Sequence, residues 1–132
     1  MERVYKLVEL YNKKYSTKFK LGEPYNLYPN DENEYGFYRE WPSNGKGGVY
    51  LILDKNKEVI YVGETNNFGR RFASYFTPDA DRRCIVKSEY WKGTPHYIIT
   101  LEAPDEALYE RLSLEAYLIK ELEPIDNTKY VG

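Results

Sequence analysis

The stretch GVYLILDKNKEVIYVG, residues 48–63, decides the fold of this chain. Two runs rich in β-branched and aromatic residues, 48–53 and 58–63, flank four polar residues that favour a turn. This pattern predicts an antiparallel β-hairpin. With a four-residue loop, the register places Tyr50 directly opposite Tyr61 on one face of the sheet. Their expected neighbours on that face are Ile52 and Val59.

Helices are expected on both sides of the hairpin. Residues 2–15 repeat apolar side chains at helical spacing, and residues 66–76 form a second helix capped by Thr65 or Asn66. A third strand is expected at 96–102, followed by a helix that begins at Pro104, runs to about residue 122 and is ended by Pro124. The inward stripe of the second helix is Phe68, Phe72 and Tyr75.

The intervening segments are irregular. Residues 22–47 are rich in Gly, Pro and aromatic residues, with one short strand expected at 35–39, and residues 77–94 are expected to form a polar connection. The sequence therefore predicts an α+β fold with a three-stranded, antiparallel-containing sheet flanked by helices. It divides into an N-terminal helix with an aromatic-rich extension (1–46) and a second region (47–132).

Composition narrows the class of protein. With 132 residues and a net charge of −2, the chain suits one domain and does not suit a protein that coats DNA through overall charge. Cys84 is the only cysteine, so no intrachain disulfide forms, and a reducing, cytoplasmic location is expected. No apolar run is long enough to span a membrane.

Charge is unevenly distributed along the chain. Residues 70–92 carry a balance of +3, and residues 102–126 carry −6. Basic side chains in the first segment are expected either as solvated loop residues or as contacts to nucleic-acid phosphates. These candidate contacts are Arg70, Arg82, Arg83 and Lys87.

One carboxylate in the last predicted helix is placed unusually. At 100° per residue, Glu115 falls in the middle of an apolar stripe, and an inward carboxylate is costly unless a cation or hydrogen bonds compensate it. Two interpretations follow: an ion pair with Arg71 or Arg111, or a metal ligand. The residues of the expected stripe are Leu108, Leu112, Ile119 and Leu122.

These features in order resemble the GIY-YIG nuclease family. The run from Gly48 to Phe76 is similar to the family signature in residue types and spacing, with Val49 in place of the usual isoleucine. Glu115 resembles the metal-binding glutamate of the family, and residues 124–127 resemble its terminal asparagine motif. The resemblance covers about residues 47–130.

The resemblance implies a role for each matched residue. Tyr50 would act as general base or orient the attacking water, Tyr61 would position water or phosphate, and Arg71 would stabilise the transition-state charge. Glu115 would hold one Mg²⁺ or Mn²⁺ ion. Tyr75 would assist proton transfer or simply pack, and Asn127 would order the site. Glu64 stands where some family members carry a lysine.

The expected function is divalent-metal-dependent hydrolysis of DNA phosphodiester bonds by water, leaving a 5′-phosphate and a 3′-hydroxyl. Specificity is expected from residues 1–46, residues 77–94, a homodimer or a partner protein. The alternative is a catalytically silent module on the same fold that binds nucleic acid or protein. Retention of the full residue set favours catalysis.

Overall fold

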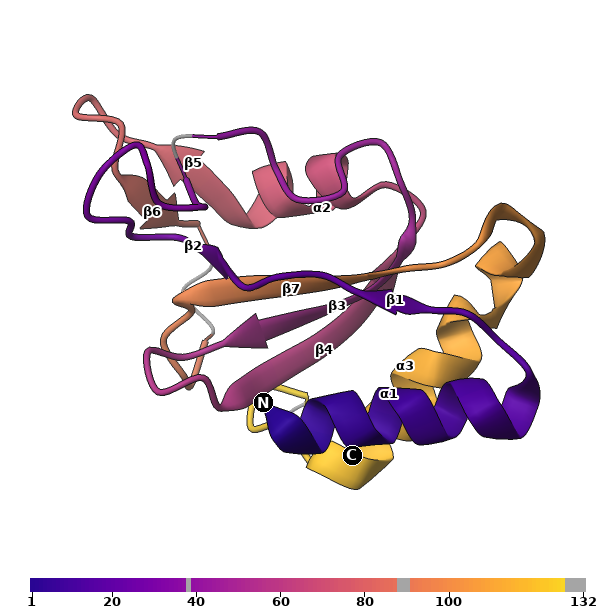
Figure 1. Ribbon diagram of the computed structural model, residues 1–132. Helices are drawn as coiled ribbons and strands as arrows, with labels where there is room; N and C mark the ends of the chain where they lie inside the picture. Colours follow the sequence, from indigo (N-terminus) through magenta and orange to yellow (C-terminus); the bar gives the residue numbers. More distant parts are fainter. Residues whose placement is uncertain (38, 88–90, 128–132) are drawn as a thin grey trace.

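The computed structural model describes residues 1–37, 39–87 and 91–127. Its centre is an antiparallel sheet with strand order β1-β7-β3-β4, in which β2 also pairs with β7 (Figure 1). The α+β class is confirmed, and the sheet gains two short strands beyond the three predicted. Its strands are β1 (Lys20–Leu21), β2 (Tyr25–Asn26), β3 (Gly48–Leu53), β4 (Val59–Thr65) and β7 (Tyr97–Glu102).

Helices cover both faces of the sheet. Alternation along β3 sends Val49 and Leu51 into one hydrophobic cluster, and Tyr50 and Ile52 into the other. The first cluster lies under α1 (Glu2–Tyr15) and α3 (Arg111–Leu122) (Figure 1). The second lies under α2 (Phe68–Tyr75), residues 25–41 and the small hairpin β5 (Phe76–Pro78) and β6 (Cys84–Val86). All six residues of β3 are buried, so β3 is the central strand of the core.

The first predicted helix, residues 2–15, is confirmed. Val4, Val8 and Tyr11 are buried on its inner face, and Ser16 ends the helix in the left-handed conformation. These residues belong to the same cluster as Leu114 of α3. The helix therefore shares a core with the strands, while the division of the chain at residue 46 stays a prediction.

The predicted hairpin is confirmed, but its register is wrong. Tyr50 pairs with Gly63, and Tyr61 pairs with Ile52. The cause is the turn, because the Asp54 carboxylate accepts hydrogen bonds from the backbone N–H groups of Asn56 and Glu58 and so draws residue 58 into the loop. A shift then follows between Ile52↔Tyr61 and Leu53↔Val59. It moves Val59 to the opposite face of the sheet, away from Tyr50.

The middle of the chain departs from the prediction in three places. The N-cap of α2 is Asn67 rather than Thr65 or Asn66, and its side chain accepts a hydrogen bond from the Arg70 N–H. The 77–94 connection contains the β5–β6 hairpin. The strand expected at 35–39 amounts to one bridge between Asn26 and Gly36 among the described residues.

The last predicted helix consists of two helices. Residues Asp105–Glu110 form the 3₁₀ helix η1, and α3 begins at Arg111. Leu108 of the expected stripe lies in η1, which has three residues per turn, so it is out of phase with the α-helical residues that follow. Ile119 and Leu122 of the expected stripe pack against the core as predicted, but Leu112 is 56% exposed, and the fully buried residues of α3 are Leu114 and Leu118.

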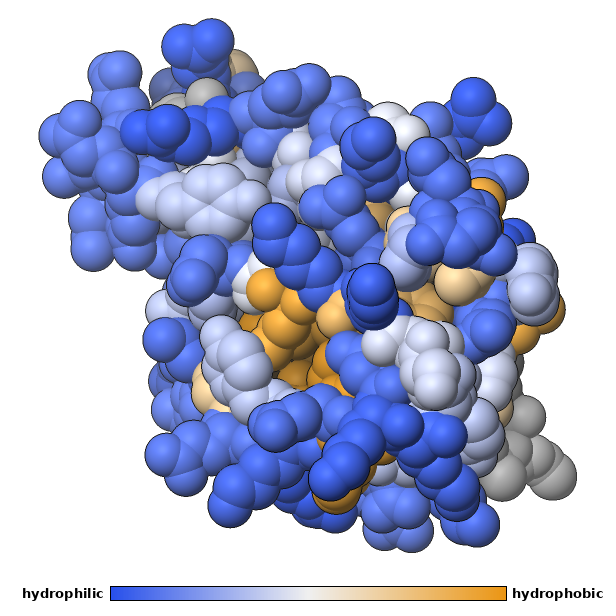
Figure 2. Space-filling view, turned by 45° about the vertical axis from the view of Figure 1, so that its right-hand side comes forward, coloured by the Kyte–Doolittle hydropathy of each residue, from blue (hydrophilic) through white to orange (hydrophobic). Residues whose placement is uncertain are grey.

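Most of the face shown in Figure 2 is hydrophilic, and hydrophobic residues come to the surface in a hollow near its centre. Among the described residues, none of the helices combines the length and apolar character needed to cross a bilayer. The predicted cytoplasmic location stays a prediction.

Candidate active site

Tyr50 stands at the centre of the candidate site. It is 1% exposed, and its ring lies across the position of Gly63 on the neighbouring strand. A Cβ atom at Gly63 would lie 2.8 Å from Cε1 of that ring, closer than real Cβ contacts allow. The glycine of the second motif is thus required because the tyrosine of the first motif occupies its side-chain space.

Three tyrosines converge here, and we call Tyr50, Tyr61 and Tyr75 the tyrosine cluster. The hydroxyl groups of Tyr50 and Tyr75 are 2.7 Å apart and share a hydrogen bond. The ring centroids of Tyr61 and Tyr75 each lie 6.1 Å from that of Tyr50. The Trp91 ring contacts Tyr61 at 5.6 Å and Tyr75 at 5.7 Å, so it closes the cluster on one side.

Burial raises the pKa of Tyr50 far above its usual value, and the neighbouring Tyr75 and Tyr61 raise it further. Arg71 acts in the opposite direction and lowers that pKa. The Tyr50 hydroxyl is therefore protonated at neutral pH and cannot take up a proton unless it passes its own proton on. Its hydrogen bond to Tyr75 provides such a route.

Arg71 supplies the positive charge of the site. Its guanidinium carbon lies 5.9 Å from the centroid of the Tyr75 ring. This is a cation–π contact between residues one helical turn apart. Partial burial lowers the pKa of Arg71, but Tyr50, the other tyrosines and Glu64 outweigh it, and the net pKa is raised. Arg71 therefore stays cationic. Arg70 is exposed on the opposite side of the helix stripe, as predicted.

Glu115 lies at the edge of the inward face of α3, not in its middle. Its side chain is half-buried, and burial raises its pKa, with Glu64 raising it further and Arg71 lowering it. Among the described residues, its carboxylate accepts no hydrogen bond and joins no ion pair. Such a carboxylate beside a second negative charge is suited to a cation.

The ion pair considered for Glu115 forms elsewhere. The Arg111 Nε pairs with the Glu64 carboxylate at 2.6 Å, and its Nη1 donates to the Leu108 carbonyl at 2.9 Å. Arg111 and Glu115 are four residues apart and thus lie on the same side of α3. The pair therefore ties α3 to the end of β4, and no residue that the structure describes forms an ion pair with Glu115.

Asn127 contacts the backbone of β4, which lies at one edge of the sheet. Its amide accepts from the Val62 N–H at 2.8 Å and donates to the Val62 carbonyl at 2.9 Å. Val62 lies between Tyr61 and Gly63, so the asparagine holds the strand that carries both. The ordering role that the family resemblance implies for Asn127 stays a prediction.

The sequence did not reveal Asp126 as a residue of this site. Its carboxylate is fully buried and accepts hydrogen bonds from the N–H groups of Lys92 at 2.7 Å and Gly93 at 3.0 Å. It thereby fixes the chain beside Trp91, which contacts Tyr61 and Tyr75. The only signal was an aspartate next to the matched asparagine, and its partners are more than thirty residues away.

Of the other predicted contacts, Lys87 adjoins the tyrosine cluster, because its backbone N–H donates to the Tyr75 carbonyl at 2.7 Å, whereas Arg82 and Arg83 lie in another part of the structure. The Lys87 ammonium donates to the Ala73 carbonyl at 2.8 Å near the C-terminal end of α2, a common structural use of lysine. Arg82 and Arg83 are exposed in the β5–β6 turn and line cavities formed with residues 25–41. Nothing places these two arginines beside Tyr50.

Among the described residues, no group of three or more His, Cys, Asp or Glu side chains could hold a metal ion. Glu115 with Glu64 nearby instead fits a hard cation that keeps most of its water, which is the preference of Mg²⁺. Of the two carboxylates, Glu64 is engaged by Arg111, whereas Glu115 pairs with no residue in the described ranges.

A hairpin tyrosine pair, an arginine on the following helix and a glutamate on the last helix define a small α+β catalytic domain of the nuclease type. The family model for the GIY-YIG catalytic domain matches residues 46–131, and the chain belongs to this family. The resemblance inferred from the motifs is thereby confirmed.

The chain is also similar to proteins named UvrABC system protein C. It is 38% identical to that of Protochlamydia amoebophila over 77 residues, which are 58% of this chain and 12% of the relative. It is 37% identical over 79 residues to that of Rickettsia prowazekii, covering 58% and 11%. For Dictyoglomus thermophilum the values are 35% over 82 residues, 62% and 12%. The chain thus spans about one eighth of these relatives.

Proposed function

We propose that this protein is a divalent-metal-dependent endonuclease that hydrolyses DNA phosphodiester bonds, leaving a 5′-phosphate and a 3′-hydroxyl. The observation that carries the proposal is the convergence of Tyr50, Tyr75 and Arg71 from β3 and α2, with Glu115 of α3 close enough to interact electrostatically with Arg71. Membership of the GIY-YIG family supports it.

In the proposed reaction, the Tyr50 hydroxyl orients a water molecule for attack on phosphorus. As the new O–P bond forms and the bond to the 3′ oxygen breaks, Tyr50 accepts a proton from the water. It passes its own proton to Tyr75 across the 2.7 Å hydrogen bond. Tyr75 is half-buried and releases its proton to solvent, and the 3′ oxygen takes up a proton from water.

Arg71 stabilises the negative charge that develops on the phosphate oxygens. Its guanidinium offers a planar set of donors that matches two phosphate oxygens at once. Packing against the Tyr75 ring fixes its direction before substrate arrives, so little reorganisation is needed during the reaction. Tyr61, held through Val62 by Asn127, positions the phosphate or the water.

Glu115 would hold the divalent cation, Mg²⁺ or Mn²⁺. A cation bound there would neutralise charge on the scissile phosphate and on the leaving oxygen. A single half-buried carboxylate that pairs with no residue the structure describes is sufficient to bind a cation that retains several waters.

The test compares cleavage of supercoiled, linear and branched DNA with Mg²⁺ or Mn²⁺ by wild type, Tyr50→Phe, Arg71→Ala and Glu115→Ala. Each variant is expected to lose about 10²-fold or more in kcat, the usual effect of removing a transition-state donor or a proton-transfer group. Arg70→Ala is the matched control, because Arg70 is the adjacent arginine and points away from the cluster. We expect it to change KM and to leave kcat nearly unchanged.

The result also decides between catalysis and a silent binding module. Metal-dependent cleavage lost in the three variants and kept in Arg70→Ala would support the enzyme. DNA binding that is equal in wild type and variants, without cleavage under any condition, would support the module. Retention of full cleavage by Glu115→Ala would contradict the assignment of the metal ligand.

A further inference from the structure

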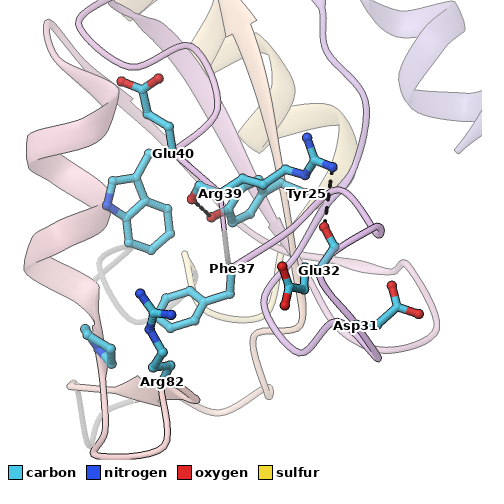
Figure 3. A pocket seen from close by; sticks show the side chains of 9 residues that line it. Tyr25, Asp31, Glu32, Phe37, Arg39, Glu40 and Arg82 are labelled. Atoms are coloured by element: carbon cyan, nitrogen blue, oxygen red, sulfur yellow. Dashed lines mark hydrogen bonds between the residues drawn. The ribbon is translucent and has the colours of Figure 1, made fainter.

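A groove on the other side of α2 belongs to neither the tyrosine cluster nor the metal site (Figure 3). Its main cavity has a volume of about 870 Å³ and lies between residues 25–41 and the β5–β6 hairpin. A second cavity of about 510 Å³ adjoins it, since Phe37 and Arg82 line both. Cavities of this size accommodate drug-sized or nucleotide-sized ligands.

The floor of the groove is aromatic and firmly supported. The Trp41 ring lies 5.6 Å from both Phe37 and Tyr25, measured between centroids. From below, Trp41 contacts Phe72 at 5.8 Å and Phe76 at 6.1 Å. A preordered aromatic floor costs little conformational entropy on binding and offers ring faces to a flat ligand.

Polar side chains surround this floor, and hydrogen bonds to the backbone fix the segments that carry them. The Tyr25 hydroxyl donates to the Arg39 carbonyl at 2.9 Å, as drawn in Figure 3. The turn that carries Arg82 is closed by Asp79, whose carboxylate accepts from the Arg83 N–H at 2.8 Å. Among the described residues, the Arg82 guanidinium and the Glu32 carboxylate have no hydrogen bond or ion pair.

The charge of the groove decides what kind of ligand it suits. The main cavity is lined by two arginines and three carboxylates, Arg39, Arg82, Asp31, Glu32 and Glu40. A track for a phosphate backbone would be predominantly basic. Acceptors and donors placed around aromatic rings instead match the edge and face of a nucleobase.

We propose that this groove binds an unpaired nucleobase of the nucleic-acid substrate. The base would stack on the aromatic floor, with Glu32 accepting from its exocyclic or ring N–H groups and Arg82 donating to its carbonyl or ring nitrogen. Only an unpaired base can enter, because a paired base is stacked within its duplex. This inference rests on the proposed function and adds a substrate class to it, nucleic acid with unpaired nucleotides.

The groove is a feature of this chain beyond the family domain. The lining residues from Tyr25 to Trp41 all precede residue 46, where the family match begins, and only Pro78 and Arg82 lie within it. The N-terminal extension therefore packs against the catalytic domain and creates a cavity that the matched domain does not form by itself.

The experiment measures binding of the intact chain to a labelled single-stranded oligonucleotide and to the same backbone with abasic sites, with a chelator present to prevent cleavage. Wild type is expected to bind the base-containing strand about tenfold more tightly, the effect of one stacked base. Phe37→Leu, which keeps apolar packing, and Arg82→Asn, which suits the left-handed backbone at φ 65°, are expected to reduce this preference severalfold. Lys18→Gln, an exposed site outside the groove, is the control.

Several results would overturn the proposal. A preference for bases that both groove variants retain would show that the groove does not bind them. Equal loss on both strands by Arg82→Asn, with a salt slope reduced by about 0.7, would assign a phosphate contact instead. If wild type cleaves DNA and the groove variants keep the wild-type preference for the base-containing strand, this inference alone would be defeated. Absence of both cleavage and nucleic-acid binding would defeat the proposed function as well.

Discussion

The two flanks of α2 are built by different means. The flank towards the hairpin carries Tyr75, whose hydroxyl bonds to that of Tyr50 in β3, and Arg71, which packs on the Tyr75 ring. The flank towards the extension carries Gly69 and Phe72, which meet Asn44 and Trp41 from the segment before residue 46. The first flank is dense and places polar atoms between aromatic rings. The second is a packing surface that leaves a cavity at its outer end.

The difference in packing predicts opposite responses to the same substitution. At Gly63, a new Cβ would meet the buried Tyr50 ring, which cannot move because Phe72 and Tyr75 pack around it. Gly63→Ala is expected to destabilise the fold by about 1–3 kcal/mol, the usual cost of overpacking a core. At Gly69, the new Cβ would meet the end of the exposed Asn44 side chain, which can rotate away.

Gly69→Ala is therefore expected to be neutral or to stabilise α2 by up to about 1 kcal/mol through helix propensity. Urea unfolding of both variants measures the contrast. Equal destabilisation by the two substitutions would show that the extension flank is packed as rigidly as the catalytic flank, and the distinction between them would then be lost.

A second prediction concerns how the catalytic flank is held closed. Asp126→Asn keeps the shape of the buried side chain but replaces one acceptor oxygen with an NH₂ group facing a backbone N–H of Lys92 or Gly93. The unfulfilled donor and the lost charge-assisted bond are expected to cost about 1–3 kcal/mol. Trp91 should also shift, so its fluorescence in the folded state is expected to change. Glu123→Gln, an exposed carboxylate three residues earlier, serves as the control.

The catalytic flank could be predicted from the sequence because its parts come from short-range order. Strand, turn and helix follow one another within residues 48–76, and hydrophobic alternation together with the motif spacing identified Tyr50, Tyr61, Arg71 and Tyr75. The register was missed because the Asp54 side chain enlarges the turn by one residue and the irregularity between Ile52 and Leu53 adds a second, neither of which an alternation pattern reports. The face of Glu115 was missed because the inward face of α3 is centred on Leu114 and Leu118, whereas the expected stripe included the exposed Leu112.

The extension could not be predicted in the same way. Its residues have no regular period, and their positions depend on contacts with distant partners, such as Trp41 with Phe72 and Gly22 with Thr100. The carboxylates behave likewise, since Asp126 binds N–H groups of residues 92 and 93, and Glu64 binds Arg111. Propensity and periodicity describe neighbours in sequence, whereas these contacts exist only after the chain has folded.

The smallest expected effect compares Asp126 with a carboxylate that does similar work in the extension. Glu34 accepts hydrogen bonds from the Asn30 N–H and from the Asn26 side chain, both at 2.8 Å, but it lies near the surface. These two bonds hold its pKa below the ordinary value of about 4.5.

A lowered folded-state pKa gives stability that is present above the unfolded pKa and is lost as pH falls through the folded value. Glu34→Gln should therefore lower stability slightly at neutral pH and flatten its decline below about pH 4.5. The midpoints of urea unfolding between about pH 3 and pH 7, which include the range in which carboxylates titrate, measure this pH dependence of stability. Glu9→Gln, exposed on α1, is the control. If the stability of Glu34→Gln declined with falling pH as steeply as that of wild type, the two hydrogen bonds of Glu34 would not anchor the extension.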